Sequence, residues 1–477
     1  MERAEAEAIY DQGRETVIAV LLRLDEQIQQ LTKQVARQGE EIAELKRRLN
    51  RNSHNSSSPP SQDPPGVPER KRPDPSGRSQ GAQPGHRGKG RKLLPAEAVD
   101  RVVDHWPARC RCGHCFAEDD REAGKPARHQ VTELPEIAVQ VIEHRLHRRL
   151  CPDCGKETRA ELPADVPPGA FGPRTEAAVA TLAIRNRVSR RDTVELMGEL
   201  FGAGLASGTV DAILGRAGEA LSGPYEDLLA RVRGAPALNV DETSWKLRGK
   251  KRTLWGAITP RAAVFRIAPD RHEREVAALL GEDFAGIVGS DRWWAYRGFD
   301  PDRRQVCWSH LIRDLTAHAE GLAEQKEFGE QGLEIARRLF SAWEDFAEHG
   351  ERARLKREVA PIERELRSLC ERAARKSKRT RLHRVFANNL LKIWPALWTF
   401  TEVDGVEPTN NIAERALRGP VIYRKLSLGS QSEQGETTIQ RLLSASVTCR
   451  LQGRSLFTYL ADALSARVRG DSTPLLA

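Results

Sequence analysis

Three carboxylates in the second half of the chain have the types and positions that metal-dependent cutting of a phosphodiester needs. Asp241 closes the apolar run 237–240, Asp291 follows the apolar run 287–290, and Glu414 lies in the first turn of a predicted helix. Two strand-end carboxylates and one helical carboxylate can converge on two Mg²⁺ ions about 4 Å apart, which stabilise the attacking and the leaving oxygen. We therefore predict Asp241, Asp291 and Glu414 as catalytic residues that bind two Mg²⁺ ions, with Mn²⁺ as a compatible substitute.

Each of these acids also has a purely structural explanation. Glu242 neighbours Asp241 on the same strand and points to the opposite face, so it is the alternative metal ligand. Asp291 can cap a following helix. Glu414 stands three residues after Asn411, which is the spacing of a capping box. The catalytic interpretation rests on the three acids together, after a plausible order of strands.

Other polar residues lie near the same predicted elements. His310, just beyond the predicted strand 305–308, is a candidate auxiliary residue, although the start of a capped helix explains it equally well. Cys307 and His310 have a ligand-like spacing, but we predict no zinc there because Cys307 reads as a strand residue. The glycine-rich segment 428–435 lacks the Gly-Lys-Ser/Thr ending of a P-loop, so ATP is not implied. The predicted DNA-binding residues are Arg415, Arg418, Arg424 and Lys425.

The elements that must position the acids follow the order of a ribonuclease H-like sheet. In that order the first and fourth strands lie side by side, which lets Asp241 and Asp291 meet. We assign 236–323 and 396–430 to this core and the charged helical stretch 324–395 to an insertion. The expected elements are a first strand ending at Asp241, strands over 254–258 and 262–267, a helix near 272–281, a strand ending at 289, and the strand 305–308.

A heptad repeat of apolar residues occupies the segment 1–50. β-branched residues dominate one position and leucine the other, which favours a parallel two-stranded coiled coil. We predict a homodimer through this helix; a single long helix packed on its own protein is the alternative. The two sets are Leu21, Ile28, Val35, Ile42 and Leu49, and Val17, Leu24, Leu31, Gln38 and Leu45.

The segment 51–92 is predicted to be a disordered basic linker. Its Ser-, Asn- and Pro-rich beginning cannot bury a core. Arg70-Lys71-Arg72 and the basic residues around Gly85-His86 follow. Such an arm fits either the tracking of a phosphate backbone or a solvated spacer.

Two Cys-x-x-Cys pairs predict a small zinc ribbon over 93–165. Four thiolates suit tetrahedral Zn²⁺ in a structural site. The segments 130–134 and 138–142 between the pairs read as strands. Cys110 can replace one ligand of the first pair, and His114 is a weaker substitute. The predicted ligands of one structural Zn²⁺ are Cys112, Cys115, Cys151 and Cys154.

Two further regions read as helical. The stretch 172–233 contains a helix, a glycine-containing turn and a second helix that starts at Ser207, which is typical of a helix-turn-helix DNA-binding region. Many helical hairpins bind no DNA, so the pattern alone does not decide the matter. The basic residues near Arg190 favour the DNA-binding interpretation. The C-terminal region 431–477 is expected to be helical from 436 to 468.

Length and composition set wide limits that agree with these motifs. The 477 residues suggest about three domains, and the net charge of +9 favours a polyanionic partner such as nucleic acid. No apolar stretch is long enough to span a membrane, and the acidic N-terminus does not resemble a signal peptide. Eight cysteines, several in close pairs, fit metal binding in a reducing compartment. We expect a cytoplasmic protein.

The sequence resembles the insertion-sequence-66 family of bacterial transposases over nearly its whole length. The shared motifs are Asn52-Ser-His-Asn-Ser-Ser-Ser-Pro-Pro, Gly81-Ala-Gln-Pro-Gly-His-Arg-Gly88, the cysteine pairs, Asn239-Val-Asp-Glu-Thr-Ser-Trp245, Ser290-Asp-Arg-Trp-Trp-Ala-Tyr296, Cys307-Trp-Ser-His310 and Asn410-Asn-Ile-Ala-Glu-Arg-Ala-Leu-Arg418, continuing to Tyr423-Arg-Lys425 and Gly429-Ser430. Two features depart from the expected pattern: Cys110 crowds the first cysteine pair, and the tryptophans after Asp291 are unusually bulky.

The resemblance implies a DDE transposase, an α+β multidomain protein whose ribonuclease H-like catalytic core carries a helical insertion. Its acidic triad would be Asp241, Asp291 and Glu414. The implied reaction cleaves at the ends of the element and transfers the exposed 3′-hydroxyls to target DNA. The first half of the chain would bind the terminal inverted repeats and pair two subunits. A bacterial, nucleoid-associated location and small accessory proteins as partners are also implied.

Two other functions fit the same residues. One is a catalytically inactive protein that represses by binding the element ends, and the other is a nuclease that cuts without joining. Incubation with end DNA and Mg²⁺ separates the three, because only a transposase gives both cut and joined products.

Overall fold

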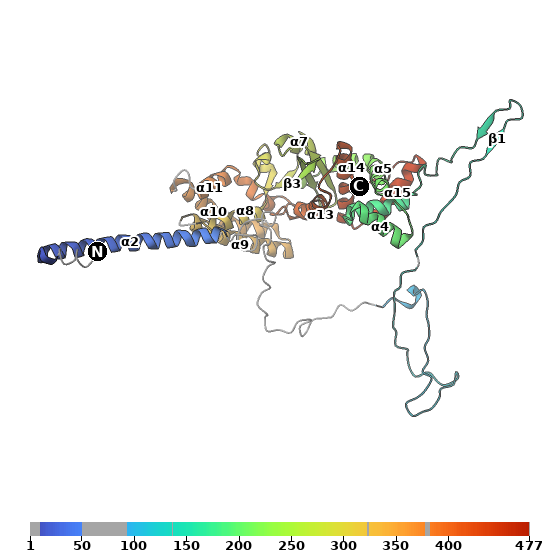
Figure 1. The fold of residues 1–477 in the computed structure, drawn as a ribbon, viewed down its shortest axis with the longest axis horizontal. Helices are drawn as coiled ribbons and strands as arrows, with labels where there is room; N and C mark the ends of the chain where they lie inside the picture. The colour runs from blue at the N-terminus through green and yellow to red at the C-terminus, as the bar shows by residue number, and fades with distance from the viewer. Residues whose placement is uncertain (1–9, 50–92, 136, 322–323, 377–381, 477) are drawn as a thin grey trace. The chain divides into compact units, whose positions relative to one another are not determined.

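The structure is a computed structural model that describes residues 10–49, 93–135, 137–321, 324–376 and 382–476. The chain divides into two compact units (Figure 1). One contains residues 143–195 and 205–477, and it also includes the N-terminal 68 residues. The other contains 69–142 and 196–204. The predicted linker 51–92 lies outside the described residues. No helix in the described part of the chain is long and apolar enough to cross a membrane.

A five-stranded mixed sheet forms the centre of the larger unit. Its strand order is β5-β4-β3-β6-β7, so the first and fourth strands of this sheet are neighbours, as predicted. β3, β4 and β5 pair antiparallel, and β6 and β7 run parallel to β3. The strands are β3 (Ala237–Leu247), β4 (Lys250–Ile258), β5 (Ala263–Ala268), β6 (Ile287–Ser290) and β7 (Arg304–Val306). The fold is therefore mixed α and β.

The β3–β4 hairpin turns at Arg248-Gly249, where both residues have positive φ angles of 48° and 79°. A two-residue turn with two positive φ values matches the right-handed twist of the strands that it joins. α7 (Glu273–Leu280) packs against β4 and leads to β6. β7 ends two residues before the predicted limit, and α8 (Trp308–Ala319) begins at once, so Cys307 is a helix cap and not a strand residue.

Helix α14 (Glu433–Leu451) lies along the edge strand β5 and bonds to its backbone. The N–H groups of Ala263, Phe265 and Ile267 donate to side chains of Thr448, Ser444 and Gln440. The bonded residues are spaced two apart in β5 and four apart in α14. Two strand residues rise about 6.6 Å and four helix residues about 6 Å, so each donor on the strand meets an acceptor on the helix. An edge strand without such partners would be a site for unwanted pairing.

Helix α13 (Asn411–Ser427) crosses the sheet and is fixed at its C-terminal end by a short loop. Ser430 donates its N–H to Lys246 O at 2.8 Å, and Ser430 O accepts from Arg248 N at 2.9 Å. The indole of Trp245 donates to Ser430 Oγ at 3.1 Å. This loop therefore locks α13 against β3, the strand that carries Asp241.

Gly429→Ala is expected to break the contacts between that loop and β3. Gly429 has φ +98°, and a Cβ there would lie 2.2 Å from Lys246 O. We expect a loss of more than about 2 kcal/mol in the free energy of unfolding, from backbone strain and the clash. Gly419→Ala on the same helix is the control, because its Cβ would meet only Arg187 Nη1 at 3.7 Å. Denaturant unfolding that gave both variants equal stability would contradict this account.

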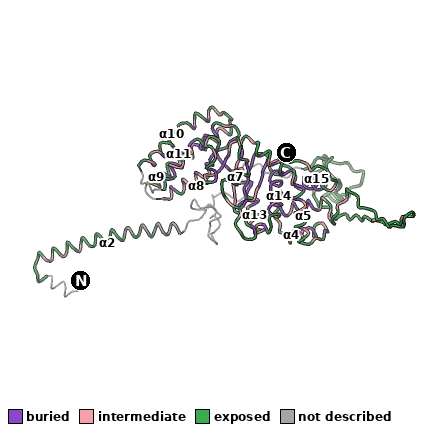
Figure 2. Tube along the Cα trace, turned by 90° about the horizontal axis from the view of Figure 1, so that it is seen from above, coloured by how far each residue is buried: buried purple, intermediate pink, exposed green. Residues whose placement is uncertain are grey.

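Between α8 and α13 the chain forms the predicted helical insertion. One apolar core joins Leu315 of α8, Leu339 of α9, Leu366 of α10 and Phe386 of α11. The helices are α9 (Glu324–His349), α10 (Arg352–Lys376), α11 (Leu382–Lys392), the 3₁₀ turn Trp394–Leu397 and α12 (Thr399–Glu402). Figure 2 shows the buried residues gathered in these helices and around the sheet.

His318 makes the insertion sensitive to acid. Its ring packs on Phe386 at 4.9 Å and on Phe328 at 5.7 Å. Burial lowers the pKa of His318 to about 4, helped by the charges of His383 and Arg292 and opposed by that of Asp314. An unfolded histidine has a pKa of about 6.5, so the stabilisation is complete above that pH and is lost as the pH falls towards 4.

Over that window the free energy of unfolding should drop by about 3 kcal/mol because of His318 alone. His318→Leu should show a correspondingly smaller drop, while the carboxylates contribute equally to both proteins. Denaturant unfolding of the two proteins at pH 7 and pH 4 measures the difference. The same loss in both would show that His318 does not titrate as described.

The helices before the sheet follow the prediction with two local differences. Ser207 is the first residue of α5, and its cap is Ala206, which makes no side-chain bond. A π-helical turn, Thr181–Arg185, follows α3. The helices are α3 (Pro173–Ala180), α4 (Arg190–Phe201), α5 (Ser207–Ala220) and α6 (Ser222–Arg233), and the C-terminal region holds α14 and α15 (Leu456–Arg469), separated at 452–455.

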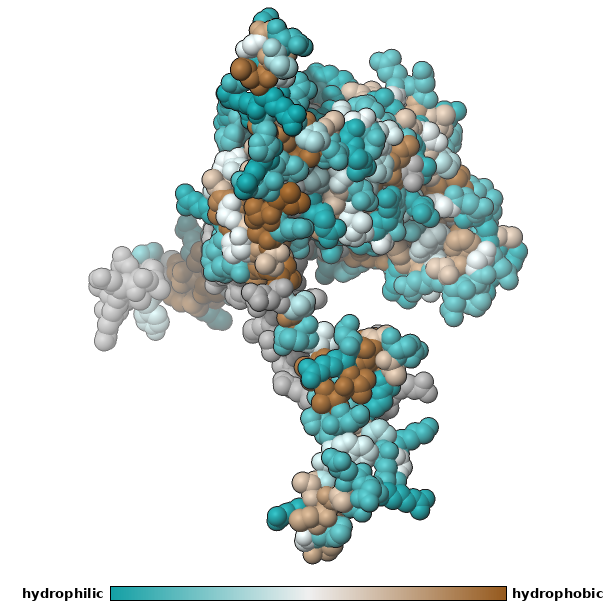
Figure 3. Space-filling model, turned by 90° about the vertical axis from the view of Figure 1, so that its right-hand side faces the viewer, coloured by the Kyte–Doolittle hydropathy of each residue, from teal (hydrophilic) through white to brown (hydrophobic). Residues whose placement is uncertain are grey.

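The strands predicted over 130–134 and 138–142 are wrong. Neither segment forms a strand ladder, and Val131 and Val141 are 79% and 87% exposed. The alternating pattern needs a partner strand and a core, and these apolar side chains have neither among the described residues. Apolar patches lie among the polar surface in Figure 3. The nearby strands that do form are β1 (Arg148–Leu150) and β2 (Glu157–Arg159), which flank the second cysteine pair.

The N-terminal heptads form one long helix, α2 (Arg14–Leu49). The first heptad set stays outside any core in the single chain: Leu21, Ile28, Val35 and Ile42 are 53–66% exposed. Figure 2 draws α2 as exposed or intermediate along its described length. The helix is thus amphipathic with an uncovered apolar seam.

Candidate functional site

The sheet brings two of the three predicted acids to the same level. β3 and β6 pair in parallel with Asn239 opposite Gly289. The same register, carried two residues further, places Asp241 level with Asp291. Asp291 leaves β6 in a tight turn, where its Oδ1 accepts the N–H of Trp293 at 2.8 Å. Asp291 does not cap a helix as predicted, because the next helical turn, Trp294–Tyr296, has Trp293 as its cap and no side-chain capping bond; the bond to Trp293 N uses one of the two oxygens of Asp291.

The third acid arrives through the loop before α13. Asn410 Nδ2 donates to Val240 O at 2.9 Å, and its backbone N–H donates to Cys307 Sγ at 3.2 Å. Trp308 N donates to Pro408 O at 2.9 Å. These bonds tie the start of α13 to β3 next to Asp241 and to the junction of β7 with α8, so Glu414 enters on the same side of the sheet.

Glu414 is not held by a capping box. The helix cap is Asn410, with no side-chain capping bond, and Asn411 is the first helical residue. The Glu414 carboxylate instead faces His310, with 3.6 Å between Oε1 and Nδ1. Both atoms are buried and make no hydrogen bond.

A family model described as Transposase IS66 family matches residues 168–438, which is more than half of the chain. The chain belongs to this family. A second model, Family of unknown function (DUF6444), matches residues 3–92.

Two proteins of Sinorhizobium fredii are similar to this IS66-family transposase. The uncharacterized protein y4hP is 24% identical over 415 residues, or 77% of this chain and 72% of the relative. The uncharacterized protein y4jD is 27% identical over 280 residues, or 52% of this chain and 53% of the relative.

Electrostatics join the three acids of the transposase into one site. Burial raises the pKa of Asp241 to about 8, and the charges of Glu242 and Asp291 add to the shift. The charge of His310 acts in the opposite sense on Asp241. Asp291 and Glu414 in turn favour the charged form of His310. All three carboxylates therefore interact with the same imidazole.

Glu242, the alternative to Asp241, has two protein partners, although the charge of Asp291 also raises its pKa. Its side chain is 2% exposed and forms an ion pair with Arg271. The hydroxyl of Tyr296 donates to its other oxygen at 2.6 Å. Burial raises the pKa of Glu242, while these two partners lower it. Both oxygens of Glu242 thus have protein partners.

The surroundings of His310 favour its charged form. Burial alone would disfavour the imidazolium, but the hydrogen bond and charge of Cys307, with Asp291 and Glu414, outweigh it. Together these interactions raise the pKa of His310 to about 9. His310 was predicted as an auxiliary residue, and it lies beside Glu414 and within electrostatic reach of Asp241 and Asp291.

The donor atoms of Cys307, His310 and Glu414 lie within 4.8 Å of one another, and in the described residues no other trio does so. The three predicted acids are thus spaced more widely. Two ions about 4 Å apart, each about 2 Å from its ligands, tolerate outer carboxylates about 8 Å apart. A two-ion centre therefore does not require the three acids to lie within 4.8 Å of one another.

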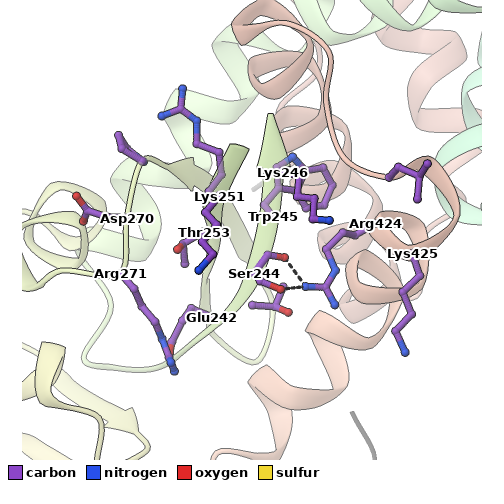
Figure 4. A pocket seen from close by; sticks show the side chains of 14 residues that line it. Glu242, Ser244, Trp245, Lys246, Lys251, Thr253, Asp270, Arg271, Arg424 and Lys425 are labelled. Carbon is purple, nitrogen blue, oxygen red and sulfur yellow. Dashed lines mark hydrogen bonds and ion pairs between the residues drawn. The ribbon is translucent and has the colours of Figure 1, made fainter. Parts of the chain in front are cut away.

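A basic groove of about 940 Å³ lies beside the site, along β3 and β4 (Figure 4). Glu242 and Arg271 border it at one end, and Lys425 of α13 borders it at the other. Lys246, Lys251 and Lys425 are exposed. None of the ion pairs recorded for the described residues includes these three lysines.

The four predicted DNA-binding residues of the transposase divide into two kinds. Arg424 donates to the backbone and hydroxyl oxygens of Ser244, and burial lowers its pKa. Figure 4 shows both bonds. Arg415, Arg418 and Lys425 are exposed on α13. In the helical region Arg190 is also internal, since it bonds Asp211 and Tyr423.

Each predicted zinc knuckle forms a tight turn. Gly113 and Gly155 have φ angles of +99° and +66°, which only glycine adopts easily. Backbone N–H bonds lower the pKa of the Cys112 and Cys151 thiols, and side-chain bonds from Cys110 and Cys154 contribute. Cys110 therefore lies beside Cys112. Cys115 forms a β-bridge with Arg109.

Sequence reasoning missed the residues that hold the acids in place. Arg304 is 2% exposed and bonds Ser290 Oγ and the Asp291 carbonyl. Arg271 also lies over the ring of Trp293, 4.0 Å from its centroid. This contact gives the bulky tryptophan a structural use. The neighbours of Arg304, Arg303 and Gln305, are polar, so no local signal in the sequence marked this arginine as buried.

Proposed function

We propose that this chain is the transposase of an insertion element that binds the terminal inverted repeats, cleaves at the ends and transfers 3′-hydroxyls to target DNA. The observation that carries the proposal is the meeting of β3, β7 and α13, which groups Asp241, Asp291 and Glu414 around His310. The strand order β5-β4-β3-β6-β7, antiparallel and then parallel, supports a ribonuclease H-like core.

The residues fit a divalent-cation site. Glu414 Oε1 is buried without a hydrogen bond, and burial together with two nearby carboxylates raises the pKa of Asp241 to about 8. Because both oxygens of Glu242 are engaged, Asp241 is the better ligand. Two Mg²⁺ ions bound by Asp241, Asp291 and Glu414 would lower the pKa of the nucleophile and stabilise the leaving oxygen.

The protein's own groups prepare the site for that chemistry. The Trp293 N–H fixes one oxygen of Asp291 and leaves the other free. Arg304 holds the turn through the Asp291 carbonyl. His310 keeps a proton near Glu414 and offsets the acidic charge before cations and DNA arrive.

We propose that DNA phosphates contact Arg415, Arg418 and Lys425 on α13 and continue into the basic groove. Exposed cations without recorded ion-pair partners are free to neutralise phosphates. Arg424 would act mainly by holding β3 in place. The helices over 172–233 would add contacts with the element end, chiefly through exposed cations such as Arg191.

We further propose one structural Zn²⁺ on Cys112, Cys115, Cys151 and Cys154, with Cys110 as a possible replacement in the first pair. The tight turn in each pair and the N–H bonds to Cys112 and Cys151 sulfur support a metal-binding role for each pair by itself, because such bonds favour the thiolate that zinc requires. The seam of α2 would join two chains in a parallel homodimer.

The test is an assay with DNA that ends in the inverted repeat, a supercoiled target and Mg²⁺. We expect nicked ends and joined products on denaturing gels. Binding without cleavage would favour an end-binding repressor and overturn the enzymatic proposal. Cleavage without joining would favour a nuclease and overturn strand transfer.

A further inference from the structure

Cys307, His310 and Glu414 form a cluster with three different kinds of donor. Cys307 caps α8, His310 lies in its first turn, and Glu414 lies in the first turn of α13. Their ligand atoms all lie within 4.8 Å of one another, and His310 Nδ1 is 3.6 Å from Glu414 Oε1. The cluster adjoins the proposed Mg²⁺ centre and shares Glu414 with it.

The donor atoms can bind a metal ion once that ion displaces the proton of His310. His310 Nδ1 and Glu414 Oε1 are buried without a hydrogen-bond partner. Such orphaned buried atoms are costly unless something binds them. Cys307 is 1% exposed, and its sulfur accepts the N–H of Asn410.

This donor set selects against Mg²⁺. Magnesium prefers oxygen ligands in an octahedron, whereas thiolate, imidazole and carboxylate together suit Zn²⁺ in a tetrahedron. Tetrahedral zinc places neighbouring donors roughly 3.3–3.8 Å apart. The 3.6 Å separation of His310 and Glu414 already has this value. Closing the remaining distances, at most 4.8 Å, needs movements of about 1 Å.

We propose that Cys307, His310 and Glu414 bind one Zn²⁺ ion, with the fourth position left to water. A zinc ion there would take Glu414 away from the carboxylate centre, so zinc would inhibit Mg²⁺-dependent cleavage. The inhibition rests on the proposed function, but the binding of the ion does not.

The test measures the number of Zn²⁺ ions bound per chain in the absence of DNA. The full-length chain is stripped of metal and titrated with Zn²⁺, and bound zinc is measured after dialysis. Wild type should bind one ion more than Cys307→Ser. Serine keeps an acceptor for the Asn410 N–H, so a purely structural role for Cys307 would leave the count unchanged. Glu414→Gln should also lower the affinity of this ion, which covers the case of a misfolded Cys307→Ser.

Cys449→Ser is the matched control, because Cys449 is equally buried and belongs to no three-donor cluster of described residues. It should bind as many ions as wild type. With Co²⁺, the sulfur-to-cobalt absorption of wild type should exceed that of Cys307→Ser and equal that of Cys449→Ser. Equal ion counts in wild type, Cys307→Ser and Glu414→Gln would overturn the proposal.

A second arm separates this site from the proposed function. In the cleavage assay with Mg²⁺, added Zn²⁺ should inhibit wild type. Absence of cleavage under every condition would sink the proposed function and leave the ion count intact. An extra bound ion with cleavage insensitive to zinc would overturn the sharing of Glu414.

Discussion

Asp241→Asn is expected to lower the rate of end cleavage by about 10³-fold or more, while end DNA binds within about threefold of wild type. The substitution removes a charged ligand from a centre that stabilises the transition state by several kcal/mol, and a loss of about 4 kcal/mol corresponds to 10³ in rate. Asp291→Asn and Glu414→Gln should behave alike. Single-turnover cleavage and gel-shift titration with the same DNA measure the two quantities.

The matched control is the neighbouring acid on the same strand. Glu242→Gln keeps the size of the side chain and an acceptor for Tyr296, and it loses only the ion pair with Arg271. We expect less than about a tenfold loss of cleavage, together with reduced stability, because removing one partner of a buried ion pair is costly.

The reverse pattern would reassign the site. If Glu242→Gln abolished cleavage and Asp241→Asn did not, Glu242 would be the ligand. If all three catalytic variants lost DNA binding as well as cleavage, the acids would be structural, and the metal centre would have to be abandoned.

The sheet could be predicted because its signals are local. Apolar runs before Asp241 and Asp291 mark two strands, and the order of elements makes these strands neighbours. The predicted end of the first strand at Asp241 was wrong, because β3 continues in its hairpin with β4 as far as Leu247. Helix α2 could be predicted for the same reason, because a heptad repeat is recognised from the spacing of its apolar residues alone. The strands at 130–142 failed for the opposite reason, since alternation alone cannot supply a partner.

The inner details of the site could not be predicted because they depend on contacts between distant segments. Asn410 is 170 residues from Val240, yet its amide bond sets the start of α13. The choice between Asp241 and Glu242 depends on Arg271 and Tyr296, which lie on later segments. Reading Cys307 as a strand residue hid its place beside His310 at the start of α8.

The second large expected effect is the loss of dimerisation when the apolar seam of α2 is changed. Ile28→Lys combined with Val35→Lys should convert a dimer into a monomer of 53.2 kDa. These side chains are 59% and 66% exposed in the single chain, so their burial is gained only on pairing. Each contributes about 1.5–3 kcal/mol when buried, and a dimer contains two of each, so the loss is about 6–12 kcal/mol. The dissociation constant should rise by at least about 10⁴-fold.

Gln29→Lys combined with Gln30→Lys is the control, because it adds the same charge on the same helix outside the heptad seam. That variant should stay dimeric in sedimentation or light scattering across the concentrations tested. A wild-type chain that sediments as a monomer would refute the seam outright. A seam variant that remained dimeric would move the dimer contact elsewhere.

Because joining requires two element ends together, the monomeric variant should still nick single ends but yield about tenfold fewer paired-end joined products, or none, at equal DNA occupancy.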